Sequence, residues 1–299
     1  MNMRSKLELT LLSSVLFLSL VGTSSAEHPA RSLMTLYASD LDNMTAVNPY
    51  TVSIFALNEV EHNRHLDEVR LYILWYFSRL NYPDNTGLTG TIYDYVIDND
   101  NERSTNQYDS VDGYAGMFLH LLHRYVRRTG NLEILLNHWD RVEDIAYLIA
   151  YFQDTDGLTR ALPGRGEKYL MDNCESYGGM SAYIALRKLA GKGRSAYYGQ
   201  VRHSLRKAIL IHLYNPDRRM FFWAMVNRTA SRTNWNQFYP DAYAQLFPLY
   251  FHVLKDNPGL QHHIWHEFIQ RYKQQVSTFP IEQRIIYELT RKTMEDLSP

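Results

Sequence analysis

The chain has 299 residues, a formal net charge of −1 at pH 7 and a single cysteine, Cys174. Its 31 Lys and Arg nearly balance its 32 Asp and Glu, which argues against a nucleic-acid-binding protein, because such proteins carry a basic surface. One cysteine excludes an intramolecular disulfide, so the fold depends on its core for stability.

The first 26 residues have the pattern of a secretory signal peptide. Arg4 and Lys6 precede a short apolar run at 9–21, and the small residues 24–26 form a cleavage site. The run is short for a membrane-spanning helix, and an uncleaved anchor is the alternative. We therefore expect an exported protein, periplasmic or secreted, without a membrane span after signal removal. Residues 27–299 are expected to form one domain, because no Pro/Gly/Ser-rich linker divides them.

Apolar residues recur at helical spacing through nearly all of the mature chain. Three stretches have the pattern of helical hairpins: 109–153 with its turn at Gly130, 174–214 with its turn at 191–193, and 241–273 with its turn at 257–259. Further helices are expected at 50–61, 65–80 and 281–295, for about ten to eleven in all. A strand at 90–96 and a short hairpin around 220–225 are the expected β elements. This pattern predicts an all-α fold.

Three long polar loops, at 82–108, 154–171 and 215–239, separate these helices. Structureless loops beyond about 12–15 residues are usually functional or disordered. Each loop precedes the start of a helix that carries carboxylates. If alternate helices form the inner and outer layers of a toroid, the three loops share one end and form the rim of a cleft.

Two of these helix starts carry the same motif. Asp109-Ser-Val-Asp112-Gly-Tyr114-Ala-Gly116-Met117 is echoed by Asp172-Asn-Cys-Glu175-Ser-Tyr177-Gly-Gly179-Met180. Each copy follows a second shared phrase, which begins at Asp84 before the first and at Asp154 before the second. A third, weaker copy at 235–248 again places Asp241 at a helix start. A unit of roughly 65 residues therefore recurs, which is typical of a helical array.

These motifs resemble the six-hairpin glycosidase superfamily, the (α/α)-barrel glycoside hydrolases. The resemblance rests on residues 108–117, 153–159, 169–180 and 235–248, together with the hairpin rhythm, and it spans most of the mature chain. It implies an (α/α) toroid of helical hairpins, with acidic residues at the starts of inner helices facing a cleft lined by Trp and Tyr. Because the chain is short for six hairpins, the toroid is expected to be complete or truncated by one hairpin.

The paired carboxylates and the resemblance together predict an exported glycoside hydrolase that cleaves a polysaccharide or oligosaccharide. Cleavage of a glycosidic bond needs one protonated carboxylic acid and one ionised carboxylate, which flank the bond from different segments. The candidates are Asp109, Asp112, Asp172, Glu175 and Asp241. Our hypothesis takes Asp112 as one catalytic carboxylate, paired with Asp172, Glu175 or Asp241.

Carboxylates at helix starts also have a purely structural interpretation. In a capping box, Asp109 and Asp172 bond the amides of the first turn, and Asp112 and Glu175 reach back. The helix dipole favours acids at these positions as well. Both interpretations stand on the sequence alone.

Expected substrate-binding residues lie near the acids, where aromatic rings stack on sugars and polar groups orient them. They are Tyr108, Tyr177, Trp235, Tyr239, Arg160, Arg165 and Gln245. Tyr177, like Tyr114, falls within a helix, where core packing is the alternative role. Arg160 and Arg165 suit an acidic sugar such as a uronate, and a solvated basic loop is their alternative.

No metal or cofactor is expected. His262 and His266 are four residues apart, but the acid follows the second histidine, unlike the zinc-protease motif. The segment beginning at Asp154 lacks the later ligands of a calcium loop, so we expect an Asx-type turn there. Two other functions stay open: a carbohydrate-binding or scaffold protein on the same fold, and a polysaccharide lyase with a Tyr or His base.

Overall fold

The computed structural model describes residues 28–37, 45–98 and 101–297, so the signal peptide predicted at 1–26 lies outside the described residues. The α-helices are α1 (Pro29–Thr35), α2 (Pro49–Glu61), α3 (Leu66–Ser78), α4 (Val111–Thr129), α5 (Leu132–Asn137), α6 (Trp139–Phe152), α7 (Leu170–Leu189), α8 (Ala196–Ala208), α9 (Leu246–Tyr250), α10 (Pro258–Tyr272) and α11 (Ile281–Asp296). Two π-helical turns, η2 (Ile209–Leu213) and η3 (Phe238–Ala242), and a 3₁₀ segment, η4 (Lys273–Thr278), complete the helical elements.

The strands are short and lie in the loops. They are β1 (Ala46–Val47), β2 (Tyr95–Asp98), β3 (Asn101–Ser104), β4 (Lys168–Tyr169), β5 (Tyr214–Asn215), β6 (Met220–Phe221), β7 (Ala224–Val226) and β8 (Thr229–Ala230). They form three small antiparallel sheets in the orders β1-β2-β3, β4-β7-β8 and β5-β6. Because β4 pairs with β7, the second and third long loops meet at one end of the molecule, as predicted.

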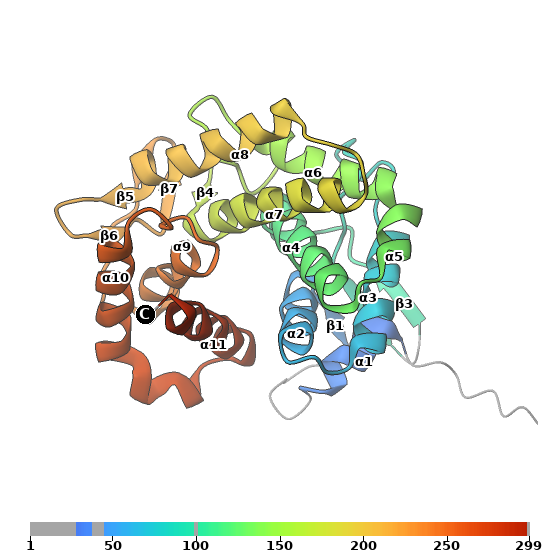
Figure 1. Ribbon diagram of the computed structural model, residues 1–299, viewed down its shortest axis with the longest axis horizontal. Coiled ribbons are helices and arrows are strands. Elements are labelled where there is room, and N and C mark those ends of the chain that lie inside the picture. Colours follow the sequence, from blue (N-terminus) through green and yellow to red (C-terminus); the bar gives the residue numbers. More distant parts are fainter. Residues whose placement is uncertain (1–27, 38–44, 99–100, 298–299) are drawn as a thin grey trace, which may run out of the picture.

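Five inner helices form a closed ring in the described residues. In chain order α2, α4, α7, α9 and α11 each pack on the next, and α11 packs back on α2. Helices α3, α6, α8 and α10 pack against the outside of this ring. Figure 1 shows the inner helices around the centre of the view, with α3, α8 and α10 outside them. The fold is therefore the predicted all-α (α/α) toroid, with five inner helices in place of six.

The predicted hairpins are confirmed with corrections at their ends. Gly130 ends α4 in the left-handed conformation at φ +70°, as expected of a terminating glycine. The outer half of that hairpin breaks at His138 into α5 and α6. The prediction of a long helix from Asp241 is wrong, since only η3 and the short α9 form there. Pro240 and Pro248 lack the amide hydrogen that a continuous helix requires.

The β predictions are displaced from the observed strands. Residues 91–94 are irregular, and the strand predicted at 90–96 begins only at Tyr95. The single hairpin expected around 220–225 is instead divided between two sheets, because β6 pairs with β5 whereas β7 pairs with β4 and β8.

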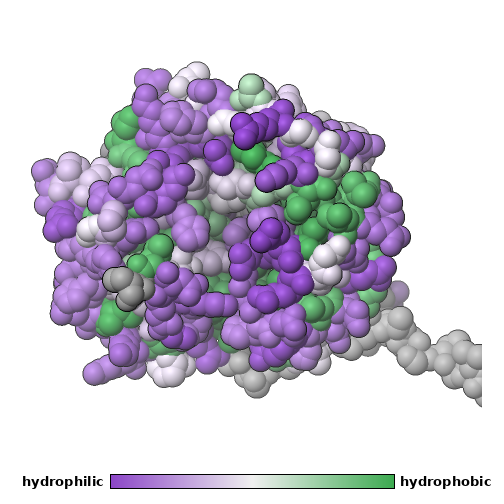
Figure 2. Space-filling view, in the orientation of Figure 1, coloured by the Kyte–Doolittle hydropathy of each residue, from purple (hydrophilic) through white to green (hydrophobic). Residues whose placement is uncertain are grey.

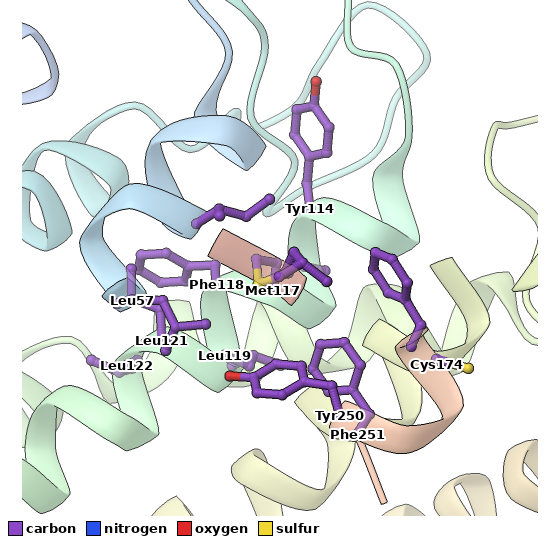
Figure 3. Close-up of a cluster of buried hydrophobic side chains, with 14 of the residues drawn as sticks. Leu57, Tyr114, Met117, Phe118, Leu119, Leu121, Leu122, Cys174, Tyr250 and Phe251 are labelled. Carbon is purple, nitrogen blue, oxygen red and sulfur yellow. The ribbon is translucent and has the colours of Figure 1, made fainter. Parts of the chain in front are cut away.

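Apolar side chains fill the ring and the space between its two layers. Figure 3 shows Leu57 of α2, Met117 and Phe118 of α4, and Phe251 after α9 in one buried cluster. The Phe118 ring stacks on Tyr76 of α3 with centroids 3.6 Å apart, which joins α4 to the outer layer. Burial of each such side chain contributes about 1.5–3 kcal/mol.

The outer surface contrasts with this core. The face in Figure 2 is mainly hydrophilic, with apolar side chains in separate patches. Among the helices of the described residues, none combines the length and apolar character needed to cross a bilayer.

Helices α4 and α7 contact one another backbone to backbone. A Cβ added to Gly116 would lie 2.5 Å from the carbonyl of Glu175, and one added to Gly179 would lie 2.5 Å from the Cα of Gly116. These two glycines occupy equivalent positions in the two copies of the repeated motif. The repeat therefore contains the contact that places the first turns of α4 and α7 side by side.

The opposite end of the ring is closed by ion pairs around Glu61, the last residue of α2. Arg124 of α4 donates from Nε and Nη2 to both carboxylate oxygens, and the Nη2–Oε2 distance is 2.7 Å. Lys292 of α11 lies 3.7 Å from the same carboxylate. Burial alone would raise the pKa of Glu61, but Arg124 and Lys292 lower it below its usual value. Glu61 thus links three inner helices at the point of ring closure.

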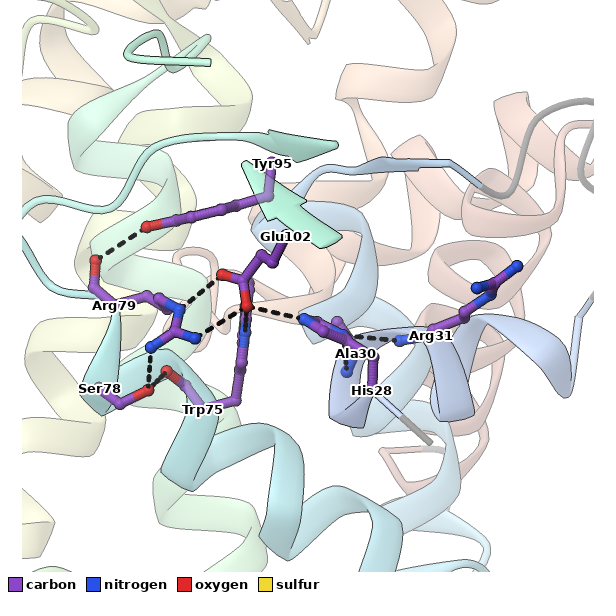
Figure 4. Close-up of polar contacts among 8 residues, drawn as sticks. All are labelled: His28, Ala30, Arg31, Trp75, Ser78, Arg79, Tyr95 and Glu102. Atoms are coloured by element: carbon purple, nitrogen blue, oxygen red, sulfur yellow. Dashed lines mark hydrogen bonds and ion pairs between the residues drawn. The ribbon is translucent and has the colours of Figure 1, made fainter. Parts of the chain in front are cut away.

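A second, partly buried carboxylate anchors the first described segment of the chain. Glu102 of β3 accepts hydrogen bonds from Arg79 Nη2 at 2.9 Å and Trp75 Nε1 at 3.2 Å, and it lies 3.0 Å from His28 Nε2 (Figure 4). Although burial opposes the change, these partners lower the pKa of Glu102 to about 2. The pairs attach residue 28 and the β2–β3 hairpin to α3.

Substitution of Gly116 by Ala is expected to lower the free energy of unfolding by about 1–3 kcal/mol or more, because the added methyl overlaps the α7 backbone. The matched control is Gly199→Ala near the start of α8, where no atom lies within 4 Å of the added Cβ. This control should be neutral or stabilising by up to about 1 kcal/mol. Urea denaturation followed by circular dichroism measures both, and equal effects would contradict the close contact.

Glu61→Gln is expected to lower the free energy of unfolding at neutral pH by about 1–2 kcal/mol, a range reduced because Arg124 is partly exposed. Since the folded-state pKa of Glu61 is lowered, this difference is present above the unfolded pKa and disappears as the pH falls through the folded value. Glu288→Gln, which breaks an exposed pair with Arg291, is the control and should change stability by less than about 0.5 kcal/mol. Equal losses for the two variants would show that Glu61 does not close the ring.

Candidate functional site

A pocket of about 200 Å³ opens at the end of the ring where the inner helices begin. The starts of all five inner helices, or the segments that lead into them, contribute to its walls. The lining residues are Asn48, Tyr50 and Thr51 at α2, Asp109, Ser110, Gly113 and Tyr114 at α4, Met171, Asp172 and Glu175 at α7, Tyr239 and Tyr243 before α9, and Glu282 and Gln283 at α11. Because helix N-termini carry partial positive charge, this end of the ring favours carboxylates.

A second compartment of about 430 Å³ adjoins the pocket and is built largely from the long loops. Its additional lining residues are Ala161, Leu162, Arg165, Glu167, Tyr169, Trp223 and Pro240. The Tyr169 and Trp223 rings are stacked at 6.0 Å with an interplanar angle of 7°. Asp109, Asp172 and Tyr239 line both compartments, so they lie where the two meet.

Ser110 is the N-cap of α4, and its Oγ accepts the Gly113 N–H at 3.0 Å. The capping interpretation of Asp109 is therefore wrong. The N-cap of α7 is Tyr169, which makes no side-chain cap bond, so Asp172 does not cap α7 either. The Ser110 hydroxyl lies 3.0 Å from Asp112 Oδ1 and 3.0 Å from Asp172 Oδ2. One serine hydroxyl thus bridges the carboxyl groups of two helices.

The two bridged carboxyl groups have different surroundings. Asp112 is 0% exposed and lies behind the pocket wall, whereas Asp172 is partly exposed and lines both compartments. Burial raises the pKa of Asp112. Burial also raises the pKa of Asp172, and the charges on Asp112 and Glu175 raise it further. A carboxyl group that borders a cleft and whose pKa is raised is equipped to donate a proton.

Glu175 lies one turn after Asp172 on α7 and faces the same pocket. It is 1% exposed, and burial raises its pKa to about 8. The Tyr50 hydroxyl of α2 donates to its Oε1 at 2.5 Å and partly opposes this rise. Glu175 therefore ties α7 to α2 across the pocket.

Asp109 supplies a carboxylate from a different segment, the loop that precedes α4. It is exposed to solvent and lines both compartments. Its backbone N–H lies 3.5 Å from the Tyr114 hydroxyl, which in turn donates to Asp94 Oδ1 at 2.9 Å. Burial raises the pKa of Asp94 to about 6. This buried network supports the loop that carries Asp109.

Among the predicted aromatic residues, Tyr239 is the one that lines the pocket. It is 55% exposed and stands at the junction of the compartments. Tyr108 instead holds its own loop, because its hydroxyl donates to Asp84 Oδ2 at 3.0 Å. Tyr177 is buried in the core, and Trp235 lies beneath the guanidinium of Arg271 at 5.7 Å. None of these three lines either compartment.

Two other predicted residues have structural roles outside the pocket. Asp241 is 2% exposed, and its Oδ1 accepts the Asn234 N–H at 2.7 Å, so the carboxylate organises its own loop. Gln245 is buried and bonds both the N–H and the carbonyl of Phe221. Arg160 lies outside both sets of lining residues, whereas Arg165 lines the second compartment together with Glu167.

The repeated loop phrases form matching turns. Asp84 Oδ1 accepts the N–H groups of Thr86 and Leu88, and its own N–H donates to the Leu88 carbonyl at 2.8 Å. At the second copy the Asp154 N–H donates to the Leu158 carbonyl at the same distance. Both turns need a glycine with positive φ, at Gly87 (+88°) and Gly157 (+89°).

Several pocket residues were missed in the sequence, notably Tyr50, Ser110, Tyr243 and Glu282. A signal exists for two of them. Tyr50 follows an Asn-Pro helix start at α2, and Glu282 is in the first turn of α11 after a proline. Helices α2 and α11 lack the repeated motif, so their acidic and aromatic residues were not among the predicted site residues. Within the described part of the chain, no group of three or more His, Cys, Asp or Glu side chains is arranged to hold a metal ion.

Comparison with known proteins finds similar structures but no similar sequence. No family model matches the sequence, and no curated protein matches it. The structure is similar to that of a rhamnosidase from Klebsiella oxytoca with rhamnose bound, with a TM-score of 0.54 and 12% identity over 92% of this chain and 55% of that chain. It is also similar to a GH76 α-mannanase from Bacteroides thetaiotaomicron, with a TM-score of 0.56 and 8% identity over 90% of this chain and 78% of that chain.

A GH78 rhamnosidase from a Bacillus strain gives a TM-score of 0.51 and 13% identity over 90% of this chain. This chain shares the (α/α)-toroid fold of these structures. It spans about half the length of the Klebsiella rhamnosidase and 28% of the Bacillus rhamnosidase. At these identities the similarity establishes the fold, and the chemistry of the site has to be argued from its own residues.

The free energy of unfolding should depend on pH through Glu175. Its folded-state pKa of about 8 exceeds the usual 4.5, so its contribution is fully present below about 4.5 and is lost as the pH rises through about 8. Wild type should therefore lose stability relative to Glu175→Gln between about pH 5 and pH 8. Urea denaturation across this range measures the difference, with Glu133→Gln on exposed α5 as the control. Parallel stability curves for wild type and Glu175→Gln would contradict the raised pKa.

Proposed function

We propose that the protein is a glycoside hydrolase that cleaves an oligosaccharide or polysaccharide between the two compartments. The observation that carries this proposal is the position of Asp109 and Asp172, which come from different segments and both line the two compartments. A substrate with one sugar unit in each compartment places its glycosidic oxygen between these carboxyl groups, as acid–base hydrolysis requires.

Asp172 acts as the general acid and Asp109 as the ionised carboxylate. The proton of Asp172 moves to the glycosidic oxygen as the bond from this oxygen to the anomeric carbon breaks. Water adds to that carbon, directly or after a covalent intermediate on Asp109, and the proton that the water loses is taken by a carboxylate of the site. Asp109 replaces Asp112 of our sequence hypothesis, because Asp112 is buried behind the pocket wall.

The substrate is proposed to be uncharged in the first compartment. Four carboxyl groups line it, from Asp109, Asp172, Glu175 and Glu282, without any Lys, Arg or His among its lining residues. A uronate there would meet the carboxylate of Asp109 without a cation to balance its charge, which weighs against the lyase alternative. Tyr239 offers an exposed ring at the junction for stacking on a sugar.

The structural neighbours support this class of activity without fixing the sugar. The names of the neighbours are rhamnosidase and α-mannanase, so related folds act on different sugars. Desolvated acids at a cleft are also more consistent with catalysis than with a scaffold, because raised pKa values cluster at functional sites. We further propose that the protein acts outside the cytoplasm, on the basis of the signal-peptide pattern at residues 1–26.

Release of reducing ends from a panel of neutral, amino and uronate glycans tests the proposal. Wild type should release them from a neutral glycan, and Asp172→Asn should lower kcat/KM by roughly 10²–10⁴-fold through loss of the acid. Asp109→Asn should produce a loss of similar size. Rescue of Asp109→Asn by azide would identify this carboxylate as the group that normally attacks the anomeric carbon or activates water.

Asp217→Asn is the matched control, since Asp217 is an exposed loop carboxylate that lines neither compartment. It should keep wild-type activity. Full activity of both Asp172→Asn and Asp109→Asn would reject the assigned pair. Binding of a glycan by wild type without any new reducing end would instead favour the carbohydrate-binding alternative.

A further inference from the structure

Two carboxylate oxygens lie within hydrogen-bond distance of the Ser110 hydroxyl, which has a single proton to donate. The Oγ accepts the Gly113 N–H at 3.0 Å and lies 3.0 Å from both Asp112 Oδ1 and Asp172 Oδ2. A serine hydroxyl has one proton and two lone pairs. It can therefore donate to one carboxylate, and the other contact is a hydrogen bond only if that carboxyl group carries a proton and donates it to Ser110.

The surroundings determine which carboxyl group carries this proton. Asp112 Oδ1 accepts the Gly113 N–H at 2.9 Å in addition to the serine contact, and Asp112 sits in the first turn of α4. Two donors stabilise its charge. The positive end of a helix acts on both carboxyl groups alike, because Asp172 lies in the first turn of α7. Within the described residues Asp172 Oδ2 has Ser110 as its one hydrogen-bond partner, and it faces the negative charge of Asp112. The proton therefore resides on Asp172.

We infer that Ser110 and Asp112 are positioning residues which keep one proton on Asp172, through a chain in which Asp172 donates to Ser110 and Ser110 donates to Asp112. The use of this proton in hydrolysis rests on the proposed function, but the shared proton itself does not. After Asp172 gives up its proton, two negative charges face each other across one hydroxyl. That repulsion favours the return of a proton to Asp172 and so restores the acid.

Other groups also face Asp172 and enter its titration. They are Asp109 from the preceding loop, Glu175 on α7 itself, Tyr50 from α2, Tyr239 and Tyr243 before α9, Glu282 from α11, and Arg165, Glu167 and Tyr169 from the second long loop. Arg165 is the one cation of this set, and it lies in the second compartment. Since four of these neighbours are carboxyl groups and one is a cation, removal of Asp112 should lower the pKa of Asp172 without returning it to that of a free aspartic acid.

The test follows the Asp carboxyl carbons of ¹³C-labelled protein by NMR as the pH is raised, with Asp172→Asn to assign the Asp172 signal. In wild type this signal should titrate well above the usual Asp range, together with the Asp112 signal, as coupled groups do. In Asp112→Asn the Asp172 titration should move to lower pH by on the order of one unit, because a facing charge is lost. Asp217→Asn should leave it unchanged.

Ser110→Ala and Ser110→Thr test the bridge separately from the helix cap. Threonine keeps both the hydroxyl and the capping group, so it should preserve the wild-type titration of Asp172. Alanine should move this titration to lower pH, because the protonated Asp172 loses the oxygen to which it donates. An unchanged Asp172 titration in Asp112→Asn, or in Ser110→Ala, would overturn the inference.

The kinetic readout distinguishes this inference from the proposed function. If the wild type is a hydrolase, the high-pH limb of kcat/KM should shift to lower pH in Asp112→Asn, because an acid with a lowered pKa loses its proton earlier. Ser110→Ala should lower kcat more than it changes KM, and Ser110→Thr should restore kcat. Coupled titration in a protein that releases no reducing ends would reject the proposed function and leave the shared proton supported.

Discussion

The contact between Gly116 and Gly179 is the constraint on which the candidate site depends. Helices α4 and α7 pack at a distance that excludes a Cβ at either glycine, and this spacing lets Ser110 of α4 reach Asp172 of α7. A hydrogen bond weakens steeply beyond its normal length, so a separation increased by one methyl group would break the bridge. The protonation of the site therefore depends on how closely these two helices pack.

The two ends of the ring differ in charge: carboxyl groups gather at one end, and cations at the other. The inner helices begin at the pocket, where their dipoles stabilise negative charge, and the acids Asp109, Asp172 and Glu282 are gathered there. The helices end at the opposite side, where Arg124 and Lys292 complement the helix C-termini and hold Glu61. Closure of the ring at that side stabilises the whole toroid, and it leaves the loops at the pocket side to form a cleft.

The sequence was sufficient for the helical periodicity, the recurring unit and the importance of the repeated carboxylates. It was insufficient for their roles, because a cap, a buried acid and a pocket acid share one pattern. Asp112 and Asp241 both stand near helix starts, yet one is bridged to Asp172 and the other holds the Asn234 amide. Which role each acid has depends on long-range packing, and the acid from α11 joins the site only because the ring closes on α2.

The repeated motif also explains how two similar acids acquire different chemistry. Asp109 and Asp172 occupy the same position in the motif, but α4 begins at Val111, two residues after Asp109, whereas α7 begins at Leu170, before Asp172. The strand β4 runs directly into α7 and starts that helix early. As a result Asp109 lies in a solvated loop, while Asp172 lies within a helix and faces Asp112 and Glu175. Two carboxyl groups whose environments differ in this way are suited to act as base and acid on one bond.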